Sequence, residues 1–120
     1  MHVVVCWWDL SGSAQTIETL RVFLREQGIE PFTAYRGLRL KSWISDPATD
    51  RWGAVFLWET AEDALAPMPP QATELIGYPP THCDSFDVEA NVEGIHSGAD
   101  LTRLGLVFAA APAPTHAPLM

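Results

Sequence analysis

The sequence is short of basic residues, and this shortage excludes polyanionic partners. Seven lysines and arginines stand against 15 acidic residues, so the formal net charge is −8. Nucleic acid is not an expected partner, because phosphate contacts need clustered cations. An anionic membrane surface is excluded by the same argument. No apolar run approaches the ~20 residues of a membrane-spanning helix, so we expect no membrane partner of either kind.

Cysteine is equally scarce, and the two cysteines, Cys6 and Cys83, lie far apart in the sequence. The start of the chain lacks the basic region and cleavage site of a signal peptide. Together these features favour a reduced, cytoplasmic protein without a disulfide. Neither the cysteines nor the four histidines have the spacing of metal ligands. No glycine-rich dinucleotide loop or haem-ligand pattern is visible either, so we expect no metal and no organic cofactor.

Apolar residues, by contrast, are abundant for a single domain. The 120 residues are 48% hydrophobic and only 18% charged, and five of them are tryptophan. The stretch 52–59 is apolar on both faces of a strand, with Trp52 and Phe56 on one side and Val55 and Leu57 on the other. A sheet buried on both faces in so short a chain needs a second molecule to cover it. The sequence therefore predicts a homodimer.

Periodicity predicts six elements in the order β-α-β-β-α-β. They are a strand over 2–9, a helix that Ser13 caps and Gly28 ends, strands over 37–46 and 52–59, a helix from Thr60 that breaks at the prolines of 67–70, and a strand over 83–92. This order is that of the ferredoxin-like fold, an α+β fold with a four-stranded antiparallel sheet.

The chain divides into two parts at the end of this pattern. We expect residues 1–93 to form the ferredoxin-like domain and residues 94–120 to be a C-terminal extension. Residues 101–110 suit a short strand or helix, which is either flexible or docked on the partner subunit. The three prolines of 111–120 favour a flexible end.

The pattern GLRLKSW followed by WGAVFLWETAEDAL, in this order of elements, resembles the YdhR-type mono-oxygenase family of the dimeric α+β barrel superfamily. The resemblance covers roughly residues 2–93. It implies a dimeric α+β barrel, in which two four-stranded sheets face each other, and in the antibiotic-biosynthesis mono-oxygenase branch it implies chemistry without a metal or organic cofactor. Other branches are isomerases, haem enzymes or proteins of no assigned activity, so the superfamily does not fix the reaction. The proline-broken second helix and the Ala/Pro tail depart from the common pattern.

The strand order of this fold, 4-1-3-2, gathers tryptophans at one end of the sheet. Those expected there are Trp7, Trp8, Trp43 and Trp52. An aromatic-walled pocket for an apolar or aromatic small molecule follows as a hypothesis. Its substrate-binding walls would be Trp8, Trp43, Trp52 and Phe56. The alternative for each tryptophan is packing in the core or at the dimer interface.

Three polar residues are candidates for catalysis. His82 is the candidate general base, because an ordinary histidine pKa of ~6.5 allows proton exchange near neutral pH. Asp9, at the adjoining strand end, is placed to orient the histidine ring. Arg39 has a permanent charge and a donor fork suited to a developing oxyanion. The alternative for His82 is a loop histidine that is merely exposed.

The strand charges have a different interpretation. Arg39 and Lys41 lie on the side of their strand opposite its aliphatic residues, as Asp87 and Glu89 do on the last strand. If the aliphatic sides face the helices, these four charges face the partner subunit and help to fix its register. Otherwise they are solvated charges of edge strands.

Two classes of function are consistent with these parts. The first is a cofactor-independent mono-oxygenase for an aromatic or polycyclic apolar molecule, in which a base removes a proton and the carbanion reduces O₂. Cyclisation or isomerisation needs the same walls, base and oxyanion donor. The second is a non-catalytic dimer, which binds a small molecule or fills its barrel with its own large side chains.

Overall fold

The computed structural model describes residues 1–32, 34–67, 70–96, 101 and 104–108. Its centre is a four-stranded antiparallel sheet in the order β2-β3-β1-β4. The strands are β1 (His2–Asp9), β2 (Leu38–Asp46), β3 (Arg51–Trp58) and β4 (His82–Asp87). This α+β arrangement is compatible with the ferredoxin-like fold, and its strand order is the one that the sequence predicts.

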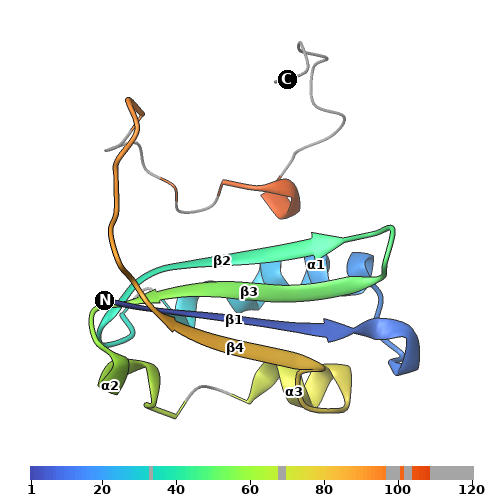
Figure 1. The fold of residues 1–120 in the computed structure, drawn as a ribbon. Coiled ribbons are helices and arrows are strands. Elements are labelled where there is room, and N and C mark those ends of the chain that lie inside the picture. Colours follow the sequence, from blue (N-terminus) through green and yellow to red (C-terminus); the bar gives the residue numbers. More distant parts are fainter. Residues whose placement is uncertain (33, 68–69, 97–100, 102–103, 109–120) are drawn as a thin grey trace.

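The helices lie on one side of this sheet (Figure 1). Helix α1 (Ile17–Phe23) continues as a π-helical turn, η2 (Leu24–Gly28), and lies behind β2 and β3. Short helices α2 (Ala61–Ala64) and α3 (Gln71–Ile76) lie along the β4 side. The described residues also contain three 3₁₀ turns: η1 (Leu10–Gly12), η3 (Glu30–Phe32) and η4 (Leu106–Phe108). None of the helices in these described ranges is long and apolar enough to cross a bilayer.

Helix α1 begins later than the sequence predicts. Thr16, not Ser13, is its N-cap, and the Thr16 hydroxyl accepts a hydrogen bond from the backbone N–H of Thr19 at 3.1 Å. The Thr19 side chain accepts in return from the Thr16 N–H, which completes a capping box. The Ser13 hydroxyl instead donates to the carbonyl oxygen of Ile76 at 2.7 Å. Ser13 therefore ties the loop before α1 to the end of α3.

The second helical region is divided, as its prolines predict. Thr60 caps α2 by accepting from the Asp63 N–H at 3.0 Å, but α2 is only four residues long. Pro70 then precedes α3, and Gly77 ends that helix at a φ of 107°, a left-handed conformation that favours glycine. Residues 68–69, within the predicted break, lie outside the described part of the chain.

Strand β4 is shorter than predicted, because it ends at Asp87 and not at residue 92. The last backbone hydrogen bond along this edge runs from the Val88 N–H to the Met1 carbonyl oxygen at 3.1 Å. Since β1 begins at His2, the described residues 89–96 have no strand beside them. Apolar side chains there are left in solvent, as the 95% exposure of Val92 illustrates.

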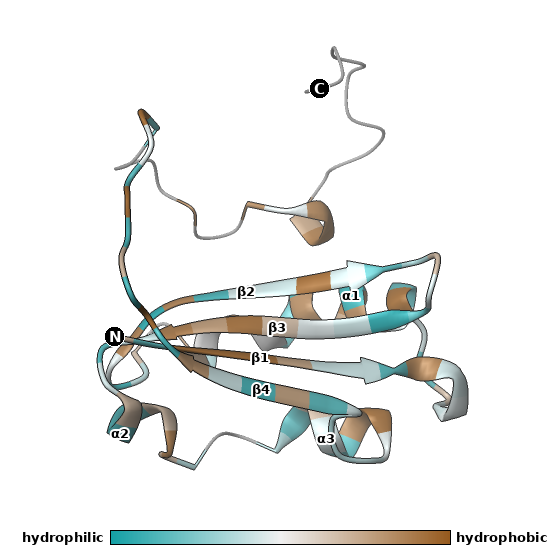
Figure 2. Ribbon diagram, in the orientation of Figure 1, coloured by the Kyte–Doolittle hydropathy of each residue, from teal (hydrophilic) through white to brown (hydrophobic). Residues whose placement is uncertain are grey.

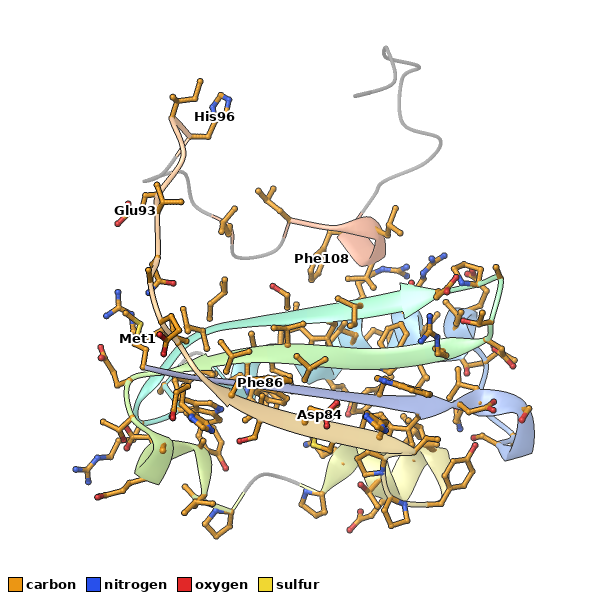
Figure 3. The ribbon with its side chains drawn as sticks, in the orientation of Figure 1. Met1, Asp84, Phe86, Glu93, His96 and Phe108 are labelled. Carbon is orange, nitrogen blue, oxygen red and sulfur yellow. A yellow bond between two sulfur atoms is a disulfide. The ribbon has the colours of Figure 1, made fainter. Side chains whose placement is uncertain are left out.

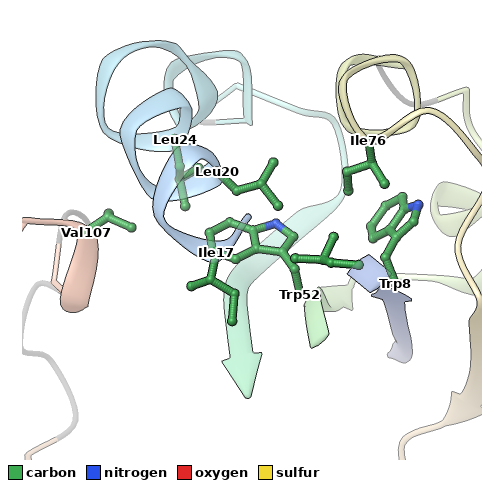
Figure 4. Close-up of a cluster of buried hydrophobic side chains, with 8 residues drawn as sticks. Trp8, Ile17, Leu20, Leu24, Trp52, Ile76 and Val107 are labelled. Atoms are coloured by element: carbon green, nitrogen blue, oxygen red, sulfur yellow. The ribbon is translucent and has the colours of Figure 1, made fainter. Parts of the chain in front are cut away.

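The core lies between the sheet and the helices (Figure 4). Trp8 and Trp52 are opposite each other in the β1–β3 register, and both are buried. Helices α1 and α3 cover them, and turn η4 adds a contact from the C-terminal extension. The buried cluster comprises Trp8, Leu10, Ile17, Leu20, Leu24, Trp52, Ile76 and Val107. Part of the extension thus packs on the domain of its own chain, whereas residues 109–120, including the predicted flexible end, lie outside the described residues.

No α-helix of the described residues covers the other face of the sheet, whose central strands β1 and β3 carry long apolar stretches (Figure 2). Leu40, Ile44 and Phe86 are 41%, 40% and 56% exposed there, and Phe86 can be followed on β4 in Figure 3. The residues that alternate with the core-facing ones also belong to this open face: Val3, Val5, Trp7, Val55 and Leu57. Trp7 and Trp8 therefore point to opposite faces.

The interpretation of Arg39 and Lys41 as charges that face a partner subunit requires the aliphatic side of β2 to face the helices, and this requirement is not met. The aliphatic side of β2 faces away from the helices, because Trp43 packs against the core cluster and Leu40 and Ile44 lie on the open face. Lys41 shares the Trp43 side and therefore points towards the helices. The free energy gained by burying the Trp43 ring is larger than the free energy lost by taking the apolar stem of Lys41, with its charged end, out of solvent contact.

The expectation of free cysteines is also wrong. Cys6 and Cys83 face each other across the β1–β4 pairing and are joined by a disulfide. The sequence could not show this, because 77 residues separate the two cysteines and only the strand register brings them together. Disulfides are rare in reducing compartments, so this bond does not support a cytoplasmic location, which stays a prediction.

Candidate functional site

The most unusual group on the helix side of the sheet is the Lys41 amine. Lys41 is the single lysine of the sequence, and its place on β2 is opposite Phe56 of β3. Its Nζ lies 3.5 Å from the centroid of the Phe32 ring, 4.4 Å from that of Trp43 and 4.7 Å from that of Phe56. Three aromatic rings therefore take the place of water around this amine.

These surroundings favour the neutral amine over the ammonium form. Among the described residues, the ion pairs leave Lys41 without a carboxylate partner. Burial lowers the pKa of Lys41 to about 7. The ring faces attract the ammonium and act in the opposite direction. At a pKa of about 7, about half of the amine is neutral at pH 7, whereas an ordinary lysine is almost fully protonated.

The Lys41 side chain lines a cavity of about 250 Å³ between the sheet and helices α1 and α3. All four predicted wall residues lie on it: Trp8, Trp43, Trp52 and Phe56. Leu20 of α1 and Leu75 of α3 close it from the helix side, and Gln71 and Thr73 add polar side chains. Whether the four aromatic residues bind a ligand stays a prediction, but the structure brings them together around one space.

A second, wider groove of about 730 Å³ adjoins β2 and the C-terminal segment 104–108. It shares Lys41, Trp43 and Trp52 with the smaller cavity. Its remaining walls include the exposed residues Leu104 and Leu106, so it is more open to solvent. The smaller cavity is the better candidate site, because aromatic and aliphatic side chains close it on both the sheet and the helix sides. Lys41 lies where the two spaces meet.

The predicted His82–Asp9 pair is not formed. Both residues lie at the tryptophan-rich end of the sheet, but His82 stacks on Trp7, with ring centroids 5.6 Å apart, and so belongs to the open face. Its Nε2 pairs with the Asp84 carboxylate at 2.7 Å. Asp9 instead accepts a hydrogen bond from the backbone N–H of Ser11, and this bond lowers the Asp9 pKa.

Arg39 lies at the other end of the sheet from His82, because β2 starts beside the end of β3. Its Nη1 donates to the Glu59 carboxylate at 2.7 Å, in a pair of which both side chains are about half exposed. Arg39 lines the wider groove but not the smaller cavity. The three predicted catalytic residues therefore do not converge on one point.

Sequence reasoning missed Lys41 as a site residue and also a polar cluster at the start of β1. Lys41 could have been found from its position two residues before Trp43, on the same face of the strand. In the cluster, His2 Nε2 is 2.6 Å from the Ser85 hydroxyl, and Nδ1 is 3.2 Å from the Asp87 carboxylate. The Asp87 side chain is 85% exposed and neither cavity reaches these residues, so the cluster's evident role is to join β4 to β1.

Within the described residues, no group of three or more His, Cys, Asp or Glu side chains is placed to hold a metal ion. The polar groups of the smaller cavity are an amine, an amide and a hydroxyl, on Lys41, Gln71 and Thr73. Such a set suits proton transfer and hydrogen bonding to an organic molecule.

In comparisons with known proteins, no family model matches the chain and no curated protein does either, so membership of the YdhR-type family remains an interpretation of the sequence pattern.

Proposed function

We propose that this protein is a cofactor-independent mono-oxygenase for an aromatic or polycyclic apolar molecule, with the Lys41 amine as its base. One observation carries the proposal: an amine with a pKa of about 7 lines a cavity whose walls include Trp8, Trp43, Trp52 and Phe56. A strongly shifted group in a cleft is a candidate for catalysis, and a base acts best when its pKa is near the working pH. Lys41 thus takes the role that the sequence suggested for His82.

The proposed reaction begins with proton transfer. Neutral Lys41 removes a proton from a phenolic O–H or an activated C–H group, and the apolar walls keep water from the resulting anion. The anion then reduces O₂. The ring carbon that is oxidised, a methylene in the keto tautomer of a phenol, loses two hydrogens and becomes a carbonyl; one oxygen atom enters the product and the other leaves as water, so the substrate supplies all four electrons. The new Lys41 ammonium stabilises the negative charge that develops on oxygen.

The size of the cavity restricts the substrate. At about 250 Å³, it falls just below the range of roughly 300–1,000 Å³ that is usual for drug-sized ligands. A molecule of one or two rings is therefore favoured for the part beside Lys41. A larger polycyclic substrate would extend past Lys41 into the wider groove along β2.

We further propose that the protein forms a homodimer through the open face of the sheet, as in a dimeric α+β barrel. The exposed apolar side chains on that face support this proposal, since large exposed apolar patches mark interaction sites. Replacing Leu57 by lysine would place an unpaired charge in such an interface. We expect sedimentation of the wild type at twice the mass of one chain and of Leu57→Lys at the mass of a single chain.

The matched control for this experiment is Val92→Lys. Val92 is 95% exposed and lies beyond the end of β4, so the same change there adds the same charge away from the face. Val92→Lys is expected to sediment as the wild type does. A wild-type protein that sediments as a single chain at micromolar concentration would refute the dimer.

Non-catalytic binding is the second candidate, because the aromatic walls of the smaller cavity are sufficient to bind an apolar ligand without any reaction. The test uses a panel of one- and two-ring hydroxylated aromatics, with tryptophan fluorescence to follow binding and an oxygen electrode to follow turnover. For Lys41→Met we expect quenching to persist and O₂ uptake to fall about 10²- to 10⁴-fold. Arg36→Met, which removes an exposed cation that lines neither cavity, is the control.

Each result of this panel selects one interpretation. Quenching without O₂ uptake favours the binding protein, and conversion of a ligand without O₂ uptake favours a cyclase or isomerase. Loss of O₂ uptake in His82→Ala but not in Lys41→Met would return the base to His82. No quenching by any compound would contradict both the enzyme and the binding protein.

A further inference from the structure

We propose that Lys41 is also a nucleophile and forms a covalent imine with aromatic aldehydes and ketones that enter the cavity between the sheet and the helices. This inference rests on the proposed function, because it names a carbonyl group as a feature of the molecules that the same cavity accepts. It adds a reaction that neither base catalysis nor simple binding requires.

The position of the amine is the first argument. Nζ lies against the faces of Phe32, Trp43 and Phe56, and Lys41 lines both the 250 Å³ cavity and the wider groove. A ligand that enters through the groove and places its ring among these aromatic side chains brings a ring-bound carbonyl next to Nζ. Binding would thus hold the carbonyl carbon and Nζ next to each other. Bringing two reactants together accounts for a large part of the barrier to a bimolecular reaction such as imine formation, and binding removes that part.

The protonation state of Lys41 is the second argument. Only the neutral amine has the lone pair that attacks a carbonyl carbon, and desolvation in an apolar pocket is one of the ways in which proteins activate lysine. Here burial lowers the Lys41 pKa to about 7. No acidic side chain among the described ion pairs holds a proton on this group.

The chemistry balances without a further reactant. The nitrogen lone pair forms a bond to the carbonyl carbon, and the carbonyl oxygen takes up a proton to give a carbinolamine. Loss of the hydroxyl with a second proton from nitrogen gives the imine and one molecule of water. The oxygen leaves as water, and Gln71 and Thr73 are the polar residues besides Lys41 that line the cavity. The protonated imine then keeps a cation against the same ring faces, which stabilise it as they stabilise the ammonium.

The sequence makes the test unusually specific. Lys41 is the single lysine of the sequence, so its Nζ is the one side-chain amine, and the amino-terminal amine of the purified chain serves as an internal reference. We would incubate the protein with 2-naphthaldehyde and sodium cyanoborohydride at pH 7 and map the reduced adduct by peptide mass spectrometry. The adduct is expected on Lys41, and it should form on the order of tenfold or more faster than on N-acetyl-lysine under the same conditions.

Three controls distinguish this reaction from non-specific labelling. Lys41→Arg retains a cation without a nucleophilic amine and should lose the adduct, while the amino-terminal amine of the purified chain reports reagent activity in every sample. Labelling of the wild type in urea should lose its preference for Lys41. The rate on folded protein should rise with pH around a midpoint near 7, as the Lys41 pKa requires. A midpoint near 10 would contradict the inference.

The outcomes also separate this inference from the proposed function. If 2-naphthaldehyde quenches tryptophan fluorescence but labels Lys41 no faster than N-acetyl-lysine, the imine is refuted and the binding cavity survives. If Lys41 is labelled and hydroxylated aromatics cause no O₂ uptake, the imine stands and the oxygenase is refuted. If there is neither quenching nor a Lys41 adduct, both proposals are refuted.

Discussion

Reduction of the Cys6–Cys83 disulfide is expected to lower the free energy of unfolding by about 2–4 kcal/mol. The bond closes a long loop, since 77 residues separate the two cysteines, and opening it restores conformational freedom to the unfolded chain. The folded state also depends on it locally. β4 is a six-residue edge strand whose residues are all exposed, so few apolar contacts hold it on β1.

Urea unfolding with and without dithiothreitol measures this effect, and the double variant Cys6→Ser/Cys83→Ser supplies the control. The variant should unfold near the midpoint of the reduced wild type and should not respond to the reductant. Equal midpoints for oxidised and reduced wild type would contradict the prediction. So would titration of two free thiols in protein denatured without reductant, because the described residues contain no unpaired cysteine.

The sequence predicts the sheet well because its strands carry clear alternation. The strand order follows from the fold that this order of elements indicates, whereas the burial of Trp52 and Trp58 on the helix side of β3 does not, because that strand is apolar on both faces. The tryptophan-rich end follows from the order of the strands. The disulfide does not follow, because it depends on the register that places Cys6 opposite Cys83. The end of β4 likewise depends on where β1 begins, which alternation within 83–92 cannot reveal.

The candidate site is predicted only in its apolar part. Strand alternation groups the wall residues of each strand on one side, but it does not show which face of β2 meets the helices, and that choice decides where Lys41 lies. A strand with Leu40 and Ile44 on one side and Lys41 and Trp43 on the other suits either choice. His82 pairs with the exposed carboxylate of Asp84, and Arg39 pairs with that of Glu59. No rule of sequence spacing predicts either pair.

Lys41→Met is expected to stabilise the protein at pH 6 by about 2 kcal/mol and to remove a rise in stability between pH 7 and pH 10. In the folded state the Lys41 pKa is about 7, and in the unfolded chain it is about 10.4. Between these values the unfolded chain binds the proton that the folded protein has released, so the free energy of unfolding increases with pH. The full difference would be about 5 kcal/mol, and solvent contact at this half-buried side chain makes it smaller.

Unfolding of the wild type and Lys41→Met should therefore be compared at pH 6, 8 and 10. The two proteins should differ most at pH 6 and converge towards pH 10, where Lys41 is neutral in the folded state. Arg36→Met loses an exposed cation, and its free energy of unfolding should change with pH as that of the wild type does. A Lys41→Met variant that is less stable at pH 6, or that differs equally at every pH, would mean that the rings hold a permanent ammonium. Lys41 would then be a structural cation, because neither proton abstraction nor attack on a carbonyl is open to an amine that keeps its proton.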